Sequence, residues 1–438
     1  MPSVKIITLG CAKNEVDSEE IAGVLAADGY ELSANGDSTD AIVINTCGFL
    51  ESAKKEGFEV IRQALSDKQK GKAGKVIVAG CLVQRMGTEI VKELPGVDAF
   101  VGVGQMGRFG EVMSQTLASK AQLFDVRPPH HRWADVGTRA RAGQPWSAYL
   151  KISEGCDHKC AFCTIPSFRG RHVSKPIERI LDEARDLAGR GAVELNLIAQ
   201  DSTQYGYDLY KKFMLPELLR SLNGIDGIAW LRLFYCYPSR VTDELIETLA
   251  TLPKALPYID VPLQHADRDV LRAMKRPGSA ETYLRMIEKL RSAMPDVAIR
   301  TTFIVGYPGE TDQQFENLLA FVKEAQFDRL GAFLYSKESG TPAAEAQNQI
   351  PTRIKRERFD RLMRLQQPIS LRRNQTWVGR TLEAIVEGRN GQYAIARTFR
   401  DAPEIDGQLF IKGDLKPGQM VSAQITRADV YDLFSEND

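Results

Sequence analysis

The sequence predicts an α/β protein with three parts: a doubly wound parallel sheet, a partial (βα)6 barrel and a small antiparallel β-barrel. Three observations predict this order. Short apolar runs alternate with amphipathic segments over about the first 120 residues, as in a parallel sheet covered by helices. The alternation restarts at Tyr149 and yields six strand candidates. The last part contains short alternating segments around Asn390-Gly391, a strong hairpin signal.

The N-terminal part, residues 1–125, is predicted from apolar strands and amphipathic helices. The strands are expected at residues 4–10, 41–46, 75–80 and 101–103, and the helices at 15–29 and 51–65. A stretch rich in proline, glycine and basic residues follows at 126–145 and predicts a linker. A chain of 438 residues has room for two or three domains of this kind.

The central part, residues 146–352, is predicted as an open barrel of six parallel strands. The strand candidates lie at 149–155, 193–202, 230–238, 258–266, 298–309 and 329–336, with helical segments such as 176–191 and 241–252 between them. In such folds the chemistry sits at the C-terminal ends of the strands. A basic connecting helix is expected at 353–372, and a β-barrel at 373–438 with strands at 381–388, 392–399, 407–413 and 420–428.

Composition and charge narrow the functional classes. Apolar residues make up 43% of the chain, which is ample for buried cores. The 57 basic and 57 acidic residues balance, so net charge indicates neither nucleic acid nor an anionic membrane as partner. The N-terminus does not read as a signal peptide, and no apolar run approaches the ~18 residues that span a bilayer. We expect a soluble cytoplasmic protein with no membrane partner, in which clustered cysteines indicate metal or redox chemistry.

Three cysteines follow the first strand of the central barrel in a CxxxCxxC pattern. They are Cys156, Cys160 and Cys163. A structural zinc site takes four protein ligands, so a zinc loop would need a distant fourth ligand such as His158 or His172. Three thiolates in a tight loop fit a four-iron cluster better, because three irons are then bound by the protein and the fourth stays open. An open iron can chelate the amino and carboxylate groups of a small molecule.

Three further cysteines each follow a predicted strand of the N-terminal sheet. These are Cys11, Cys47 and Cys81. The carboxyl ends of parallel strands share one edge, where ligands bind, so the three thiols are expected to converge. The favoured interpretation is a second iron–sulfur cluster with one free iron, and the alternative is three structural cysteines. Cys236 has no partner pattern and is expected to be a packed strand residue.

The triplet "GCDHKCAFC" on a loop after the first barrel strand resembles the radical S-adenosylmethionine (AdoMet) superfamily. The resemblance implies that this cluster gives an electron to AdoMet, which splits into methionine and a 5′-deoxyadenosyl radical. It also implies that Phe162 lies against the adenine, and that Gln200 or Asp201 binds the amino group. The usual Gly-Gly-Glu is absent at that position. Arg300 is the candidate for the AdoMet carboxylate, and the alternative is an exposed arginine at the strand end.

Two such clusters on these two domains resemble the methylthiotransferases over nearly the whole chain. The segments "LGCAKNEVDSE", "NTCGF" and "AGCLVQR" are similar to the family's N-terminal domain, "FIVGYPGET" to its fifth barrel strand, and the closing barrel to its TRAM domain. The resemblance implies a transferase that replaces a C–H hydrogen by a methylthio group. One AdoMet methylates sulfur on the N-terminal cluster, and a second makes the radical at the Cys156, Cys160 and Cys163 cluster. An electron donor such as a flavodoxin or ferredoxin, and a monomeric enzyme, are expected.

The family has one branch that modifies an adenosine in transfer RNA and one that modifies the β-carbon of an aspartate in small-subunit ribosomal protein twelve. The motif wording "CDHKCAFCTIPSFRG", "FYCYPS" and "VPLQHAD" resembles the second branch. The charge of the predicted C-terminal barrel also favours the second branch, because residues 373–438 carry eight basic and ten acidic side chains. The basic residues are Arg373, Arg380, Arg389, Arg397, Arg400, Lys412, Lys416 and Arg427, and the acidic residues are Glu383, Glu387, Asp401, Glu404, Asp406, Asp414, Asp429, Asp432, Glu436 and Asp438.

A slightly acidic module is a poor clamp for RNA and a better dock for a basic ribosomal protein. We therefore expect Asp401, Glu404 and Asp406 to assist docking. Deletion of residues 373–438 should then weaken docking and spare AdoMet cleavage. The alternatives are a local basic patch that binds transfer RNA, and a non-catalytic iron–sulfur scaffold for ribosome assembly.

Overall fold

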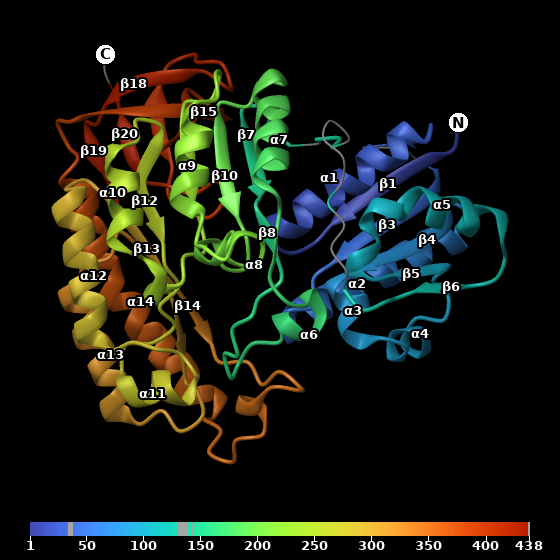
Figure 1. The fold of residues 1–438 in the computed structure, drawn as a ribbon, viewed down its shortest axis with the longest axis horizontal. Coiled ribbons are helices and arrows are strands. Elements are labelled where there is room, and N and C mark those ends of the chain that lie inside the picture. The colour runs from blue at the N-terminus through green and yellow to red at the C-terminus, as the bar shows by residue number, and fades with distance from the viewer. Residues whose placement is uncertain (34–37, 130–132, 134–138, 142, 437–438) are drawn as a thin grey trace.

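The computed structural model describes residues 1–33, 38–129, 133, 139–141 and 143–436, and three six-stranded sheets follow one another along this chain (Figure 1). The first sheet is parallel, in the order β2-β1-β3-β4-β5-β6. Its strands are β1 (Ser3–Thr8), β2 (Glu31–Leu32), β3 (Thr39–Thr46), β4 (Ala73–Gly80), β5 (Ala99–Val101) and β6 (Leu123–Asp125). Its helices are α1 (Ala12–Ala27), α2 (Glu51–Gln69), α3 (Cys81–Met86), α4 (Glu89–Glu93), the 3-10 helix η1 (Val103–Arg108) and α5 (Phe109–Ala118).

The apolar runs of β3 and β4 are buried on both faces, as a parallel sheet between two helical layers requires. Helices α1 and α5 pack on one face, and α2, α3 and α4 on the other. The sheet therefore has the doubly wound form that the sequence predicts. Strands β2 and β6 were not predicted, because both are short and carry half-exposed or exposed side chains instead of an apolar run.

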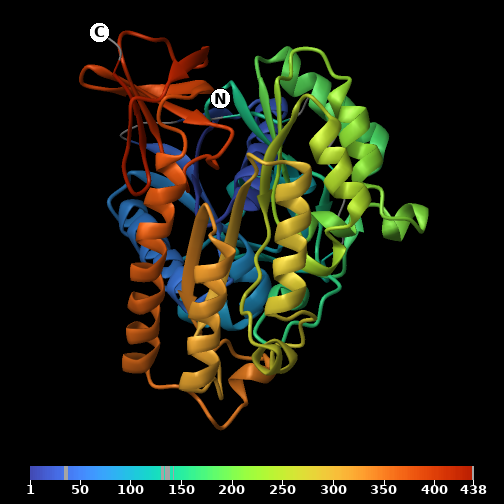
Figure 2. The same ribbon diagram turned by 90° about the vertical axis from the view of Figure 1, so that its left-hand side faces the viewer.

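The second sheet contains six parallel strands in the order β7-β10-β11-β12-β13-β14. These strands are β7 (Ser147–Lys151), β10 (Glu194–Ile198), β11 (Trp230–Leu233), β12 (Ala255–Asp260), β13 (Ala298–Val305) and β14 (Arg329–Leu334). Its long helices are α7 (Ile177–Gly189), α9 (Leu215–Asn223), α10 (Asp243–Thr251), α12 (Ala280–Ala293) and α13 (Asp312–Ala325), and they cover the outer face in Figures 1 and 2. The predicted partial barrel is thus confirmed.

Short elements at the C-terminal ends of these strands form the rim of the barrel. They are β8 (Ser153–Glu154), α6 (Ile165–Arg169), β9 (Val173–Ser174), η2 (Ser202–Gln204), α8 (Tyr207–Tyr210), η3 (Pro238–Arg240), α11 (Arg268–Ala273) and η4 (Pro342–Ala344). Strands β8 and β9 pair antiparallel and close the loop between them, which holds Cys156, Cys160 and Cys163. The hairpin thereby anchors both ends of the cysteine loop.

The third sheet has the order β18-β15-β16-β17-β20-β19 and is antiparallel except for the parallel pair β17 and β20. Its strands are β15 (Thr381–Asn390), β16 (Tyr393–Thr398), β17 (Leu409–Lys412), β18 (Met420–Gln424), β19 (Arg427–Ala428) and β20 (Leu433–Ser435). The hairpin predicted at Asn390-Gly391 is present, and Gly391 adopts φ 58° there. Helix α14 (Thr352–Gln375) runs along the barrel beside α13 and leads into this sheet (Figure 2).

The C-terminal sheet covers the inner face of the barrel with buried ion pairs. Glu194 on β10 accepts hydrogen bonds from Arg232 (3.0 Å) and Arg397 (2.5 Å). Arg329 on β14 pairs with Asp401 (3.0 Å from its Nε). Because alternate residues of a strand point to opposite faces, the outward leucines of β10 and β11 contact helices while these inward charges meet the third sheet.

This arrangement corrects the expected acidic docking surface. Asp401 is buried against Arg329, and the Asp406 carboxylate is largely covered and lies 3.3 Å from Arg300. Glu404 alone of these three is exposed. When only the exposed residues are counted, basic and acidic residues are nearly balanced on the surface of the described module. The exposed basic residues are Arg380, Arg389, Lys412, Lys416 and Arg427, and the exposed acidic residues are Glu383, Glu404, Asp414 and Asp429.

The linker expected at 126–145 lies partly outside the described residues. In its described part, Arg139 is buried and forms ion pairs with Glu19 of α1 and Glu183 of α7 (2.6 Å to the latter). The segment is therefore tied to both the first sheet and the barrel at this point.

Candidate functional site

The first three cysteines meet at the carboxyl edge of the N-terminal sheet, as expected. Cys11 follows β1 and caps α1, Cys47 follows β3, and Cys81 follows β4 and begins α3. A Cβ atom on Gly10 would lie 2.6 Å from the Cβ of Cys47, and one on Gly48 would lie 2.7 Å from the carbonyl oxygen of Cys81. Only glycine lets the three loops approach so closely, and at Gly10 the φ of 102° also favours it.

The second triad lies in the loop between β8 and α6. The Cys156 amide donates to the carbonyl of Gly170 (3.1 Å), and the Cys163 amide donates to that of Cys160 (3.1 Å). All three side chains are partly exposed at the C-terminal end of the barrel strands. The loop conformation is thus held by its own backbone and by the β8–β9 pair.

The donor set fits an iron–sulfur cluster better than a single ion. Among the described residues, no three His, Cys, Asp or Glu side chains lie close enough to hold one metal ion. Thiolates on one zinc ion would lie roughly 4 Å apart, since each Zn–S bond is about 2.3 Å, whereas the thiolates of a four-iron cluster bind different irons and lie farther apart.

Both histidines considered as zinc ligands have other contacts. His158 lies 2.6 Å from a carboxylate oxygen of Asp201 and stacks on Tyr237 with 3.7 Å between ring centroids. His172 is buried, and its Nε2 lies 3.1 Å from the hydroxyl of Ser174. The geometry therefore provides three thiols in each triad, with these two imidazoles engaged elsewhere.

Burial keeps several of these thiols protonated until a metal binds. It raises the pKa of Cys81, Cys156 and Cys163 to about 12 each. Burial also raises the pKa of Cys47. Thiolates are the form that binds metal, so cluster assembly must release protons at these positions.

A buried polar network connects the two triads. Arg169 on α6 donates from Nε to the sulfur of Cys81 (3.1 Å) and from its other nitrogens to Asn14 (2.7 Å) and Glu154 (3.0 Å). Glu154 precedes the second triad and also accepts a hydrogen bond from Gln200. The roles of Arg169 and Glu154 could not be predicted from the sequence, because only the fold brings the α6 loop to the edge of the first sheet.

The buried carboxylates of this network are shared between its cations. Asp17 of α1 pairs with Arg169 (2.9 Å) and with Lys151 (2.5 Å), and Lys151 also lies 3.4 Å from Glu154. Burial opposes the charged form of Lys151, but the carboxylates around it outweigh burial and raise its pKa. A second arginine contacts the other triad. The guanidinium group of Arg276 lies 3.5 Å from the sulfur of Cys160.

The residues expected to contact AdoMet have different surroundings. Phe162 packs against the apolar cluster that contains Tyr307 and Tyr335, beyond the ends of β13 and β14. Gln200 follows β10, and its side-chain amide donates a hydrogen bond to Glu154. The side-chain oxygen of Gln200 is buried without a hydrogen-bond partner among the described residues. Asp201 binds His158 and the amide of Thr203 (2.9 Å).

Arg300 does not fit its expected role. It lies near the start of β13, whereas the triad lies beyond the opposite ends of the strands. Its guanidinium pairs with Asp260 (2.9 Å) and Asp406 (3.3 Å), at the contact with the third sheet. Two carboxylates already neutralise this arginine, so it joins the barrel to the C-terminal module. The sequence could not show this, because Asp406 is distant in the chain.

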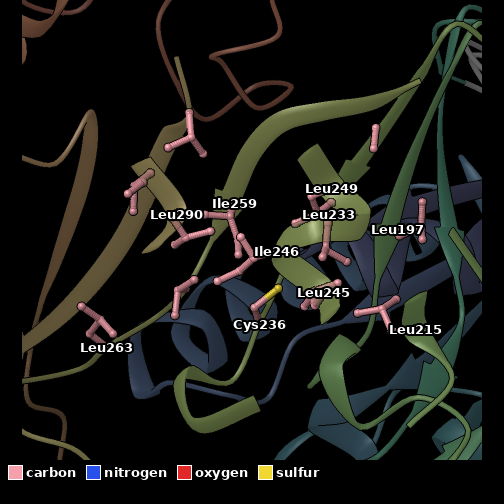
Figure 3. Close-up of a cluster of buried hydrophobic side chains, with 14 of the residues drawn as sticks. Leu197, Leu215, Leu233, Cys236, Leu245, Ile246, Leu249, Ile259, Leu263 and Leu290 are labelled. Atoms are coloured by element: carbon pink, nitrogen blue, oxygen red, sulfur yellow. The ribbon is translucent and has the colours of Figure 1, made fainter. Parts of the chain in front are cut away.

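Cys236 lies in the core, as expected, although just beyond the end of β11. Its sulfur is surrounded by leucine and isoleucine side chains of the barrel (Figure 3). Burial raises the pKa of this thiol as well. It packs as an apolar side chain.

Comparisons with known proteins agree with this architecture. The model of the radical SAM superfamily matches residues 150–322, that of the uncharacterized protein family UPF0004 matches 3–102, and that of the TRAM domain matches 378–437. Among solved structures, the radical AdoMet methyltransferase TsrM from Kitasatospora setae has a TM-score of 0.60 at 15% identity, covering 78% of this chain and 77% of its own. This likeness concerns the fold.

Two curated relatives cover almost the whole chain. The proteins from Symbiobacterium thermophilum and Desulforamulus reducens are 47% and 45% identical to it. The matches cover 99% and 100% of this chain, and 90% and 99% of the relatives. Both are named ribosomal protein uS12 methylthiotransferase RimO.

The fold and these matches define a radical AdoMet methylthiotransferase. Within that class, the chain belongs to the RimO family. Its described residues contain no helix that is both long and apolar enough to cross a bilayer.

Proposed function

We propose that this enzyme adds a methylthio group to the β-carbon of an aspartate in ribosomal protein uS12. The observation that carries the proposal is the full-length similarity to proteins named for that activity, at 43–47% identity. The convergence of two cysteine triads on one buried network supports it, because a transfer reaction with two sulfur-bound clusters needs both near one substrate atom.

Cys11, Cys47 and Cys81 would hold one four-iron cluster, and Cys156, Cys160 and Cys163 the other. When bound, the clusters and AdoMet supply the electron, the sulfur atom, the methyl group and the hydrogen-abstracting radical. The protein would hold the two clusters and AdoMet in a fixed position relative to one another. Arg169 and Glu154 fix the α6 loop against the first sheet, and Arg276 places a positive charge beside Cys160.

Phe162 and Gln200 would contact AdoMet, Phe162 from the apolar side of the rim and Gln200 from the end of β10. Gln200 has a free buried carbonyl oxygen, which suits an ammonium donor. The enzyme would act in the cytoplasm as a monomer, with a flavodoxin or ferredoxin as reductant.

The test is methylthiolation with purified components. Reconstituted enzyme, AdoMet and a chemical reductant are incubated with uS12, and the protein is digested for mass spectrometry. We expect a mass gain of one CH2S unit on a single aspartate. Transfer RNA incubated in parallel should contain no 2-methylthioadenosine. Modified transfer RNA with unmodified uS12 would refute the proposed substrate, and cluster-loaded enzyme that cleaves no AdoMet would instead indicate a scaffold.

A further inference from the structure

Lys13 is a buried lysine that has no anionic partner among the residues that the structure describes. Its side chain lies in the first turn of α1, close to Cys11, and the residue is only 7% exposed. Its Nζ lies 3.1 Å from the centroid of the Tyr235 ring. Within the described chain, no carboxylate lies within ion-pair distance of this ammonium group.

Two other buried lysines differ in this respect. Lys151 pairs with Asp17 (2.5 Å), and Lys175 pairs with Glu183 (2.5 Å). Lys355 also has no carboxylate partner among the described residues, but its ammonium group donates a hydrogen bond to the backbone carbonyl of Tyr335 (2.8 Å). A buried charge without a partner is costly, so an ammonium group held only by an aromatic face is poised for an anion.

The position of Lys13 places such an anion between the two triads. On one side is Cys11, the N-cap of α1, whose side chain makes no capping hydrogen bond within the described part of the chain. The positive end of this sixteen-residue helix adds to the lysine charge. On the other side, Tyr235 follows β11, and its near neighbour Tyr237 stacks on His158 in the loop of the second triad.

Tyr235 itself has an unusual backbone. Its φ is 58°, in the left-handed region that bulky side chains rarely adopt. The conformation is held by hydrogen bonds from its amide to Asp260 (3.1 Å) and from the Ser202 amide to its carbonyl (3.0 Å). Such strain is typical of residues that a site keeps in one orientation, and here it keeps the ring beneath the Lys13 ammonium.

We propose that Lys13 and the N-terminal end of α1 bind the side-chain carboxylate of the substrate aspartate. This inference rests on the proposed function. The carboxylate carbon is bonded directly to the β-carbon, so holding the carboxylate at Lys13 presents the β C–H bond between the two triads. An adenine ring offers no anionic group to this lysine. Lys13 is therefore a specificity-determining residue for an acidic side chain over a nucleobase.

The test compares binding of two substrates by cluster-loaded enzyme. One is uS12, and the other is uS12 with the modified aspartate replaced by asparagine, which removes the charge and keeps the shape. Charge-assisted hydrogen bonds predict that wild-type enzyme binds the aspartate form about tenfold or more tightly. The Lys13→Met variant should lose most of this preference and keep only the smaller contribution of the α1 N-terminus, and Lys13→Arg should restore a preference. Lys92→Met, on an exposed lysine of α4, is the matched control and should behave as wild type.

The readouts separate this role from the alternatives. AdoMet cleavage by Lys13→Met should persist, and its iron content should match that of wild type. Equal binding of the two substrates by wild-type enzyme would overturn the inference, as would a Lys13→Met variant that keeps the full wild-type preference for aspartate. A variant that changes only the reduction potential of the N-terminal cluster would show that the lysine serves the cluster instead. Absence of aspartate modification by wild type would refute the proposed function, and it would do so independently of the binding ratio.

Discussion

Arg169 lies with its Nε 3.1 Å from the sulfur of Cys81, although it belongs to the helix directly after Cys163. One side chain thus connects the loop of the second triad to the cysteine that starts α3. Asp17 and Glu154 neutralise its remaining charge. A shift of the first sheet relative to the barrel would break these buried contacts. Arg169 therefore helps to fix the distance between the triads, because it packs between the two domains.

Arg169 should tune the potential of the cluster bound by Cys11, Cys47 and Cys81. A cation beside a ligating sulfur favours the reduced, more negative cluster. Arg169→Lys keeps the charge and should change the potential little. Arg169→Met should lower it by an amount on the order of tens of millivolts, measured by redox titration with electron paramagnetic resonance.

Arg276→Met provides the matched comparison for the other cluster, because Arg276 contacts Cys160. Each substitution should shift the potential of its own cluster only. The exposed Arg185 serves as a control, and Arg185→Met should leave both potentials unchanged. Identical shifts in both clusters for either arginine would contradict the assignment.

Two separate cysteine triads predict two clusters. Protein reconstituted without oxygen should bind about eight irons. The variant with Cys156, Cys160 and Cys163 replaced by alanine should keep about half of that iron. Iron and sulfide analysis measures both values. Wild-type protein with about four irons, or a triple variant with none, would disprove the N-terminal cluster.

The two triads should serve separate steps, sulfur insertion at one and AdoMet cleavage at the other. Replacing Cys11, Cys47 and Cys81 together should abolish sulfur insertion, while 5′-deoxyadenosine is still formed from AdoMet at the other cluster. Chromatography of the nucleoside and mass spectrometry of uS12 report the two activities. A folded variant that forms no 5′-deoxyadenosine would show that the clusters are not independent.

The buried Glu194 should make stability depend on pH. Burial opposes its charge, but Arg397 and Arg232 outweigh burial and lower its pKa from an ordinary 4.5 to about 2. Ionised Glu194 therefore stabilises the folded state fully above about pH 4.5, and this contribution disappears as the pH falls toward 2. Melting temperature against pH should fall less steeply in Glu194→Gln than in wild type.

Near neutral pH, Glu194→Gln should itself be less stable by about 3–5 kcal/mol, because two buried guanidinium groups lose their partner. The exposed Glu383→Gln is the matched control and should change stability by less than about 0.5 kcal/mol. Equal melting temperatures for wild type and Glu194→Gln at pH 7 would contradict the inferred importance of this contact.

Deletion of residues 373–438 should damage the barrel, contrary to what the sequence suggested. The deletion removes Arg397, Asp401 and Asp406. Arg329 then loses its carboxylate partner, and Glu194 and Arg300 each lose one of their two ion-pair partners. Loss of three buried ion pairs predicts a large decrease in melting temperature and loss of AdoMet cleavage. A truncated protein with wild-type melting temperature and AdoMet cleavage would show that the third sheet is a separable module.

The sequence by itself determined the order of the three sheets and the positions of both triads. Apolar runs followed by cysteine are local features, and the rule that parallel strands share a carboxyl edge was enough to bring Cys11, Cys47 and Cys81 together. The hairpin at Asn390-Gly391 was readable for the same reason, since its signal lies within a few residues.

Only the tertiary structure decided which charges meet. Arg300 was assigned to AdoMet because it begins a barrel strand, but the fold places it against Asp260 and Asp406. The same is true of the contacts of Arg169 with Cys81 and of Lys13 with Tyr235. These partners are far apart in the chain. The local sequence around a charged residue does not show whether its counter-charge is a neighbouring residue, a distant side chain or a substrate.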